Sequence, residues 1–225
     1  MARRAEEGYF STTMQTIALI DYDYGNVRSV ERALAEAGRA SGVACDIRLT
    51  RDPAFVAAAD RIVLPGQGAF AACMDALVAN GPLLSAVTET VQARGVPFLG
   101  ICVGMQLMMT RGLEHGEHAG LGWIAGDCAP LATDERLPHM GWNAVTPVKA
   151  HPVLDGLSPE RHMVFMHSFV VAPVNNAAVA ARTTYGASFV SAVAQDNIVG
   201  VQFHPEKSQA AGLDLLARFL DWSPV

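Results

Sequence analysis

The residues best suited to chemistry begin with a cysteine between two glycines. Cys102 lies in the segment Gly100–Gly104 (GICVG), where an apolar strand-like run meets an apolar helix-like run. Small residues two positions before and after a nucleophile let a strand and a helix pack closely around a tight turn. Unpaired N–H groups at the start of the helix would favour the thiolate over the thiol. The pattern therefore predicts a nucleophile, although a buried structural cysteine would show the same motif taken alone.

A nucleophilic cysteine needs a base, and His204 is the best placed of the seven histidines. It follows the apolar run Ile198–Phe203, so we expect it at the carboxyl edge of the same sheet as Cys102. Glu206 comes two residues later, after Pro205, and could return to the imidazole to orient it and stabilise its cation. A strand-end histidine bonded only to backbone is the alternative for His204.

Donors for a developing oxyanion could come from the segment Pro65–Gly68 (PGQG), which follows another apolar strand. Its glycines free the backbone to turn N–H groups toward a tetrahedral intermediate. We therefore assign backbone donors to Gly66, Gln67 and Gly68, and to Val103 directly after the cysteine. The alternative is a dinucleotide fingerprint (GQGAFA), but that motif normally belongs to the first strand, and no acidic residue ends a following strand at the expected distance.

One loop contains three residues of types that can bind a metal ion. His115, Glu117 and His118 are close in sequence, but they lie in a polar loop with no second ligand pair. We predict a solvated loop there and no metal centre.

The first half of the chain alternates strand-like and helix-like patterns with short connections. Such alternation predicts a mostly parallel sheet with helices on both faces, which binds ligands at the carboxyl ends of its strands. The predicted strands are Thr16–Ile20, Ala44–Leu49, Arg61–Leu64 and Val96–Ile101, and the predicted helices are Val27–Ala37, one starting at Pro53, one from Phe70 onward, and Val103–Met109.

The second half has few helical patterns, so we expect antiparallel strands added to the same sheet. A final amphipathic helix is predicted over Ala210–Leu220. The predicted strands are Ala144–Val148, Met163–Val171, Val179–Thr183, Val190–Ala194 and Ile198–Phe203.

Length and composition limit the remaining possibilities. The 225 residues fit a single domain, which we place at residues 14–225, with residues 1–13 as a disordered extension. A net charge of -6 and the lack of a basic cluster beyond Arg3-Arg4 argue against nucleic-acid and anionic-membrane partners. The longest apolar run, Val96–Met109, is too short and interrupted to span a bilayer. Four scattered cysteines favour a reducing cytoplasm over a disulfide scaffold.

Two segments together resemble a known enzyme family. Gly100–Gln106 (GICVGMQ) is similar to the cysteine elbow of class I glutamine amidotransferases, and Gly200–Ser208 (GVQFHPEKS) is similar to their His-x-Glu segment. Relatives that serve anthranilate or folate synthesis usually carry Gly-His-Gln after the elbow and lack a Met-Gly-Trp-Asn segment. Four further segments resemble the glutaminase subunits of imidazole glycerol phosphate synthases: Asp21–Val30 (DYDYGNVRSV), Leu64–Phe70 (LPGQGAF), Pro138–Asn143 (PHMGWN) and His167–Phe169 (HSF).

The resemblance implies a three-layer flavodoxin-like amidotransferase fold and hydrolysis of glutamine to glutamate and ammonia. By this likeness Cys102 attacks the amide, His204 transfers the proton, and Glu206 orients His204. No metal or organic cofactor is implied. The remaining carried-over positions are Gln106, His167 and Ser168 for binding glutamine, and Asn26, Trp142 and Lys207 for the interface with a partner.

The partner that the resemblance implies is a (β/α)8-barrel cyclase subunit in a heterodimer. It would use channelled ammonia to make imidazole glycerol phosphate and aminoimidazole carboxamide ribonucleotide in histidine biosynthesis. Two alternatives stay open: an ammonia-donating subunit of another synthase, and a non-catalytic regulatory module of the same fold.

Three positions depart from the family pattern. Gln67 replaces the usual valine of Pro-Gly-Val-Gly, Asp23 replaces a usual glycine, and Phe169 stands where a tyrosine is common. An oxyanion hole built from backbone N–H groups tolerates the change at Gln67. Phe169 lacks a hydroxyl, which puts in doubt any substrate hydrogen bond carried over to that position.

Overall fold

A computed structural model describes residues 14–224, and its centre is a five-stranded parallel sheet. The strand order within the larger sheet is β2-β1-β3-β4-β14, and every neighbouring pair among these five is parallel. All residues of β3 and β4 are buried, as expected for parallel strands covered on both faces. The strands are β1 (Gln15–Ile20), β2 (Cys45–Thr50), β3 (Arg61–Gly66), β4 (Phe98–Cys102) and β14 (Ile198–Val201).

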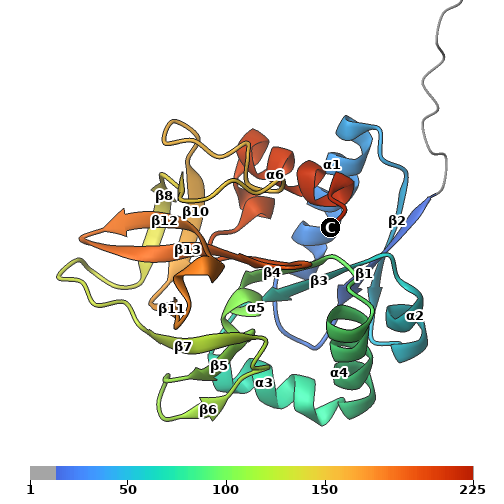
Figure 1. Ribbon diagram of the computed structural model, residues 1–225, viewed down its shortest axis with the longest axis horizontal. Helices are drawn as coiled ribbons and strands as arrows, with labels where there is room; N and C mark the ends of the chain where they lie inside the picture. Colours follow the sequence, from blue (N-terminus) through green and yellow to red (C-terminus); the bar gives the residue numbers. More distant parts are fainter. Residues whose placement is uncertain (1–13, 225) are drawn as a thin grey trace, which may run out of the picture.

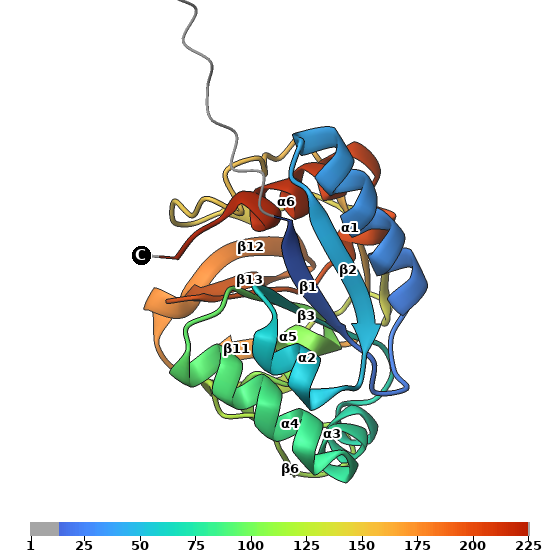
Figure 2. The same ribbon diagram turned by 90° about the vertical axis from the view of Figure 1, so that its right-hand side faces the viewer.

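Helices cover both faces of this sheet and give the three layers that the sequence predicts. Figures 1 and 2 show α1 and α6 on one face and α2, α3 and α4 on the other. The apolar stripe of α1, including Val30 and Leu34, is buried against the sheet. The helices are α1 (Val27–Ser41), α2 (Pro53–Ala58), α3 (Phe70–Ala79), α4 (Gly81–Thr88), continued by a π-turn at Glu89–Ala93, and α6 (Gln209–Asp221).

The local signals for these helices are readable in the chain. Pro53 occupies the first turn of α2, and the side chain of Asp52 accepts a hydrogen bond from the Ala54 N–H at 2.9 Å. No single helix among residues 14–224 is long and apolar enough to cross a membrane. The pair Phe70–Ala79 and Gly81–Ala93 passes that test only when its two parts are joined across a 99° bend.

An antiparallel extension continues the sheet beyond β14 in the order β13-β11-β7-β5-β6, with β12 paired to β13 and β9 paired to β12. Within it β5 and β7 are parallel, and the other pairs are antiparallel. The mixed sheet that the sequence predicts is therefore confirmed. The strands are β5 (Met109–Gly112), β6 (His118–Ala119), β7 (Ile124–Pro130), β9 (Thr146–Pro147), β11 (Phe169–Pro173), β12 (Val179–Tyr185) and β13 (Ala187–Gln195).

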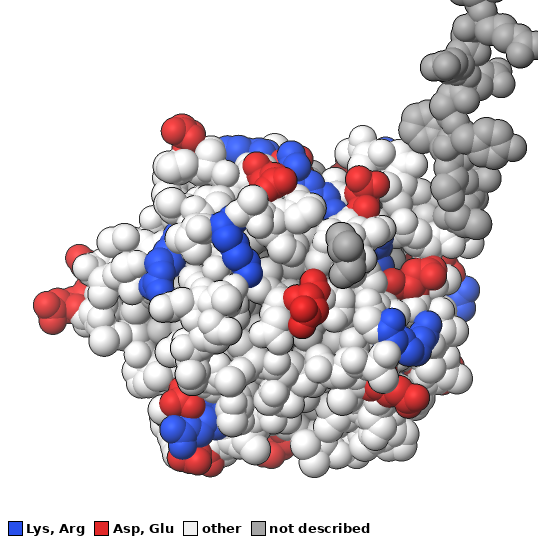
Figure 3. All heavy atoms as spheres, in the orientation of Figure 1, with Lys and Arg blue, Asp and Glu red and all other residues white. Residues whose placement is uncertain are grey.

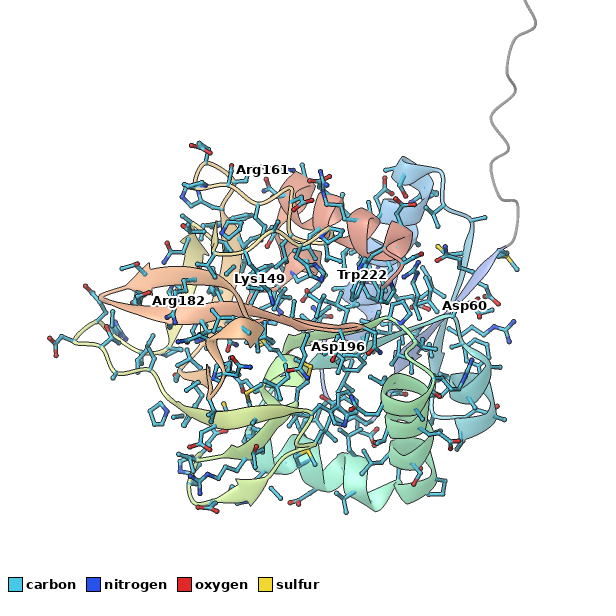
Figure 4. All side chains as sticks on the ribbon, viewed as in Figure 1. Asp60, Lys149, Arg161, Arg182, Asp196 and Trp222 are labelled. Atoms are coloured by element: carbon cyan, nitrogen blue, oxygen red, sulfur yellow. The ribbon has the colours of Figure 1, made fainter. Side chains whose placement is uncertain are left out.

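A separate two-stranded sheet stands beside this extension. It pairs β8 (His139–Asn143) with β10 (Met163–His167), antiparallel, and lies at the end of the molecule opposite β2 (Figure 1). The loop before β10 is anchored to α6, because Arg161, labelled in Figure 4, donates to the carboxylate of Asp214 at 2.7 Å. The small sheet is thereby fixed against the helix layer.

The predicted helix Val103–Met109 is wrong beyond its first turn. Helix α5 covers only Val103–Gln106, and Met109–Gly112 forms β5. The carbonyls of Leu107 and Met108 accept hydrogen bonds from the N–H groups of Leu121 and Ile124, so tertiary partners replace the helical ones. An apolar run of this length fits a buried strand as well as a buried helix, and periodicity cannot separate the two.

The predicted strands of the second half also need correction. The run Met163–Val171 is two strands in different sheets, separated at Ser168, and only the short β9 falls within Ala144–Val148. Strand β14 ends at Val201, two residues earlier than predicted. Strands β5, β6, β7 and β8 were not predicted, because β5, β6 and β8 have at most five residues and β7 mixes apolar residues with glycine, aspartate and proline. The expectation for residues 1–13 lies outside the described residues.

Candidate active site

Cys102 lies at the end of β4 and caps the N-terminus of α5, in a strained backbone conformation. Its φ and ψ are 55° and -111°, a region that residues with side chains rarely adopt. The flanking glycines make this turn possible: a Cβ on Gly104 would overlap the Leu64 carbonyl oxygen, and one on Gly100 would lie 2.8 Å from the Gly104 oxygen. The strand-turn-helix arrangement of a nucleophile elbow is present, with its side chain at the carboxyl edge of the sheet.

His204 reaches the same edge because β14 lies directly beside β4, with Val201 opposite Ile101. Its backbone N–H donates to the Val164 carbonyl at 2.8 Å, and its carbonyl accepts the Ser208 hydroxyl at 2.6 Å. The imidazole Nδ1 lies 2.9 Å from Oε1 of Glu206, whose side chain is almost fully buried. The histidine is therefore fixed on both its backbone and its ring.

The electrostatics of His204 join the three residues. Burial alone lowers the pKa of His204, but hydrogen bonds and negative charge from Cys102 and Glu206 outweigh burial and raise that pKa to about 9. A raised imidazole pKa favours the imidazolium form of His204, which can protonate a leaving group. The geometry can support nucleophilic attack followed by protonation of a leaving group.

The loop Pro65–Gly68 ends β3 and lies directly against the elbow. Gly66 is opposite Cys102 in the sheet, and a Cβ on it would lie 2.7 Å from the Val103 Cβ. Gly68 has φ +108°, so the loop uses a conformation that favours glycine. Within residues 14–224 the N–H groups of Gln67 and Gly68 have no hydrogen-bond partner. No backbone hydrogen bond of Gln67 or Gly68 would therefore be lost if a peptide of this loop turned its N–H toward an oxyanion.

Two residues that were not predicted to belong to the site, Tyr22 and Cys73, donate hydrogen bonds to carbonyls of this loop. The Tyr22 hydroxyl donates to the Pro65 carbonyl at 2.7 Å, and the Cys73 thiol donates to the Gln67 carbonyl at 3.6 Å. Burial raises the pKa of Cys73 to about 11, so it stays a protonated donor. Tyr22 is 43 positions from Pro65, so its contact is long-range, whereas Cys73 is only six positions from Gln67 and sits on the helix that follows the loop.

A cavity of about 280 Å³ opens over the cysteine and joins most of the predicted site. Gly66 and Glu206 are not among its lining residues. Residues lining it that the sequence analysis did not assign to the site are Glu114, Pro138, Met166 and Phe169, and the predicted ones are Gln67, Gly68, Cys102, Val103, Gln106, His167, Ser168, His204 and Lys207.

Gln106 and His167 already have partners within the protein. Nε2 of Gln106 donates to the Phe169 carbonyl and to Oε1 of Gln202, each at 3.1 Å. His167 is bonded to His139 and to the Phe169 carbonyl. Burial and the nearby His139 lower the pKa of His167 to about 3, despite the Phe169 carbonyl acting in the opposite direction. Ser168 sits at the break between β10 and β11 and faces the cavity.

The three predicted interface residues occupy different elements near this edge. Trp142 is on β8 and is 52% exposed, together with Met140 on the same strand. Lys207 lies in the short helix Pro205–Lys207, and its ammonium group lies 3.4 Å from the Met166 sulfur. Asn26 precedes α1, and its carbonyl accepts the N–H groups of Ser29 and Val30.

In the loop that contains His115, Glu117 and His118, the carboxylate already has a partner. Glu117 pairs with Arg111 at 2.9 Å, and within residues 14–224 no group of three His, Cys, Asp or Glu residues is arranged to hold a metal ion. Figure 3 shows acidic and basic side chains interspersed over the described part of one face, with no continuous basic surface there.

Comparison with known proteins gives concordant matches. The model of the family "Glutamine amidotransferase class-I" matches residues 18–222. The chain is 51% identical to imidazole glycerol phosphate synthase subunit HisH of Caulobacter vibrioides, covering 94% of this chain and 100% of that protein. It is 46% identical to the HisH of Rhodospirillum rubrum, covering 92% and 99%.

Solved structures agree at the level of the fold. A crystal structure titled glutamine amidotransferase matches with a TM-score of 0.68 and 17% identity, covering 91% of this chain and 99% of that one. A glutamine amidotransferase from Thermotoga maritima matches with a TM-score of 0.57 and 17% identity, covering 86% and 77%.

Proposed function

The chain belongs to the class-I glutamine amidotransferases and, within them, to the HisH subunits of imidazole glycerol phosphate synthase, and from that premise we propose that Cys102, His204 and Glu206 hydrolyse glutamine to supply ammonia to a cyclase partner. The observation that carries the proposal is the buried arrangement of elbow cysteine, histidine and carboxylate at one sheet edge, with the pKa of His204 raised by its two neighbours despite burial.

The reaction follows from the positions of these groups. The Cys102 thiolate attacks the amide carbon of glutamine, and the charge on the carbonyl oxygen is taken by backbone N–H groups at Gln67, Gly68 and Val103. The His204 imidazolium gives its proton to the departing amine, so the C–N bond breaks and ammonia leaves. Water, deprotonated by the now neutral imidazole, then cleaves the glutamyl thioester to give glutamate. Glu206 orients His204 throughout.

Glutamine binding is assigned to the cavity beside Cys102. Ser168 and the free carbonyl of the Gln106 side chain offer polar groups to the substrate, while His167 lines the same wall. Phe169 has no side-chain hydroxyl, and its carbonyl already accepts from Gln106 and His167, so no substrate hydrogen bond is assigned to it.

The partner is proposed to bind the outer face of the small sheet. Met140, Trp142 and Met166 expose large apolar surface on neighbouring strands, and β8 and β10 pair Met140 with Met166 directly. Exposed apolar groups gathered on one face mark interaction sites. Lys207 and Asn26 would contribute polar contacts at its margin. The partner is a (β/α)8-barrel cyclase that makes imidazole glycerol phosphate and aminoimidazole carboxamide ribonucleotide, and we place the complex in the cytoplasm.

The test measures ammonia released from glutamine by the purified chain, alone and with the cyclase subunit and its nucleotide ligand. We expect slow turnover alone and an increase of about 100-fold or more in the loaded complex, the size of effect given by one oxyanion donor. A flip of a peptide in Pro65–Gly68 would supply that donor, since glycines there allow it. Full activity of the chain alone would rule out this regulation by the cyclase.

A matched pair of variants tests the interface. Lys207→Ala should weaken the stimulation by the cyclase while basal turnover is nearly unchanged. Arg48→Ala, on β2 at the far edge of the sheet, serves as the control, because it removes an exposed cation away from the proposed face. Loss of stimulation in both variants, or in neither, contradicts the assignment.

A chain whose Cys102 does not react with a glutamine-analogue alkylating agent would instead favour a non-catalytic module.

A further inference from the structure

The proposed mechanism gives no nucleophilic or proton-transfer role to several buried polar side chains. His139, His167, Gln106 and Gln202 are each at most 5% exposed. Burying so many polar groups is costly unless each has a partner. Together with Asn143 and the Phe169 carbonyl they form one connected set, which we call the buried polar network.

One end of the buried polar network has a fixed donor direction. The Asn143 side-chain oxygen accepts the Ala144 N–H at 2.8 Å, so its nitrogen faces the Thr184 carbonyl (2.9 Å) and Nε2 of His139 (3.3 Å). An amide nitrogen can only donate, so Nε2 of His139 accepts. Burial lowers the pKa of His139, which favours the neutral ring with its proton on Nδ1. That Nδ1 proton is therefore available to His167.

The next two hydrogen bonds run in the same donor-to-acceptor direction, from His139 to His167 and from His167 to the Phe169 carbonyl. Nδ1 of His139 donates to Nε2 of His167 at 3.1 Å, and Nδ1 of His167 donates to the Phe169 carbonyl at 3.1 Å. A carbonyl cannot donate, so the proton on His167 must be on Nδ1 and its Nε2 must accept. Both rings are neutral and each has one possible tautomer.

The other end of the buried polar network reaches the nucleophile. Gln106 uses Nε2 to donate both to the Phe169 carbonyl and to Oε1 of Gln202. Because Oε1 of Gln202 is the acceptor, its Nε2 must point the other way, and it lies 3.7 Å from the Cys102 sulfur. The amide of Gln202 therefore presents an N–H to the nucleophile.

We propose that Gln202 is a positioning residue that donates to the Cys102 sulfur and stabilises its thiolate, and that His139 and His167 hold in place the Phe169 carbonyl that orients Gln106 and, through Gln106, Gln202. The inference rests on the proposed function of Cys102 as nucleophile. Hydrogen bonds to an ionised acceptor are stronger than those between neutral groups, so the donor favours the thiolate over the thiol. No part of the buried polar network needs to change its protonation during turnover.

The first experiment measures the reactivity of Cys102 directly. Gln202→Leu removes the donor at similar volume, and iodoacetamide labelling at pH 7 is followed on the Cys102 peptide by mass spectrometry. We expect labelling about 10-fold slower than in the unaltered chain, together with a lower thiolate absorbance at 240 nm. In the complex with the cyclase, kcat should fall with little change in KM.

The matched control is Ser191→Ala. Ser191 is fully buried on β13, its backbone carbonyl accepts the Gln202 N–H at 2.9 Å, and its hydroxyl has no partner among the described residues. The substitution removes a buried polar group beside Gln202 without touching the buried polar network, so labelling should be unchanged. Equal labelling rates in Gln202→Leu and the unaltered chain would overturn the proposal.

A second pair of variants decides the matter even if Gln202→Leu fails to fold. His167→Asn can place an N–H near the position of Nδ1 and keep the donation to Phe169, whereas His167→Leu cannot. We expect labelling of Cys102 to slow about 5-fold in His167→Leu and to be largely restored in His167→Asn. Equal loss in both, or loss in neither, would overturn the proposal. If the unaltered chain labels rapidly but releases no ammonia with the cyclase, the proposed function fails while the proposal stands.

Discussion

The parallel sheet and the small β8–β10 sheet differ in how their polar residues are placed. In the parallel sheet, Cys102 and the loop Pro65–Gly68 each follow directly on a buried strand, so chain order puts them at the carboxyl edge. In the small sheet, His139 and His167 meet across strands that are far apart in sequence. The proposed reacting groups therefore come from the ends of local strands, whereas the polar residues of the small sheet depend on long-range pairing.

The variant with the largest expected effect lacks the proposed nucleophile at the edge of the parallel sheet. Cys102→Ala should lower glutamine hydrolysis by about 10⁴-fold or more, since the remaining groups cannot form the thioester. The small side chain is lost without a large void, so the melting temperature and binding of the cyclase should be retained. Ammonia release and calorimetry on the same sample check both parts. Undiminished release would refute the assignment of Cys102.

A second prediction contrasts the two faces of the small sheet. Phe165 is fully buried among Phe189, Phe203 and His139, and Phe165→Ala should cost about 3 to 5 kcal/mol of unfolding free energy. Trp142→Ala, on the exposed face, should change stability by about 0.5 kcal/mol or less yet weaken cyclase binding about 30-fold. Urea denaturation and titration calorimetry make the two measurements. Similar stability losses for both variants would contradict the two-faced description.

Glu206 connects the two regions, because the backbone of its partner His204 is bonded to Val164 of β10. Glu206→Gln keeps an acceptor for Nδ1 but removes the charge that helps raise the pKa of His204. We expect kcat to fall about 100-fold, and less than in His204→Ala. The double variant should lose much less than the sum of the two free energies. Additive losses would show that the residues do not act as a unit.

The smallest effect is a pH dependence of stability that arises in the small sheet. The pKa of His167 is about 3 in the folded state and 6.5 when unfolded, so the unfolded chain binds the extra proton. Its contribution to stability is fully present above pH 6.5 and is lost as pH falls toward 3. The loss of stability between pH 7 and pH 5 amounts to about 2 kcal/mol.

His167→Asn should reduce this slope. His139, whose pKa is also lowered by burial, contributes a slope of the same sign, so part of the slope remains in the variant. Urea denaturation at pH 7, 6 and 5 measures the slope. Identical slopes in the two proteins would show that His167 is not held neutral.

The parallel layer and the residues at its edge could be predicted from the sequence alone. Strands with continuous apolar runs, a proline-started helix and the glycines around Cys102 act through neighbours in the chain, so their signals are local. The motifs at Cys102 and His204 predicted that the two lie at one edge, because parallel strands share their carboxyl ends.

The surroundings of those residues depend on tertiary contacts that the sequence does not reveal. Val103–Met109 reads as one helix until partners from Leu121 and Ile124 take its carbonyls, and Met163–Val171 reads as one strand until Ser168 separates two sheets. The donation from Gln202 to Cys102 depends on hydrogen bonds between residues up to 100 positions apart. Such bonds form only after the antiparallel strands pair, because pairing sets which polar groups are buried together and therefore which must satisfy one another.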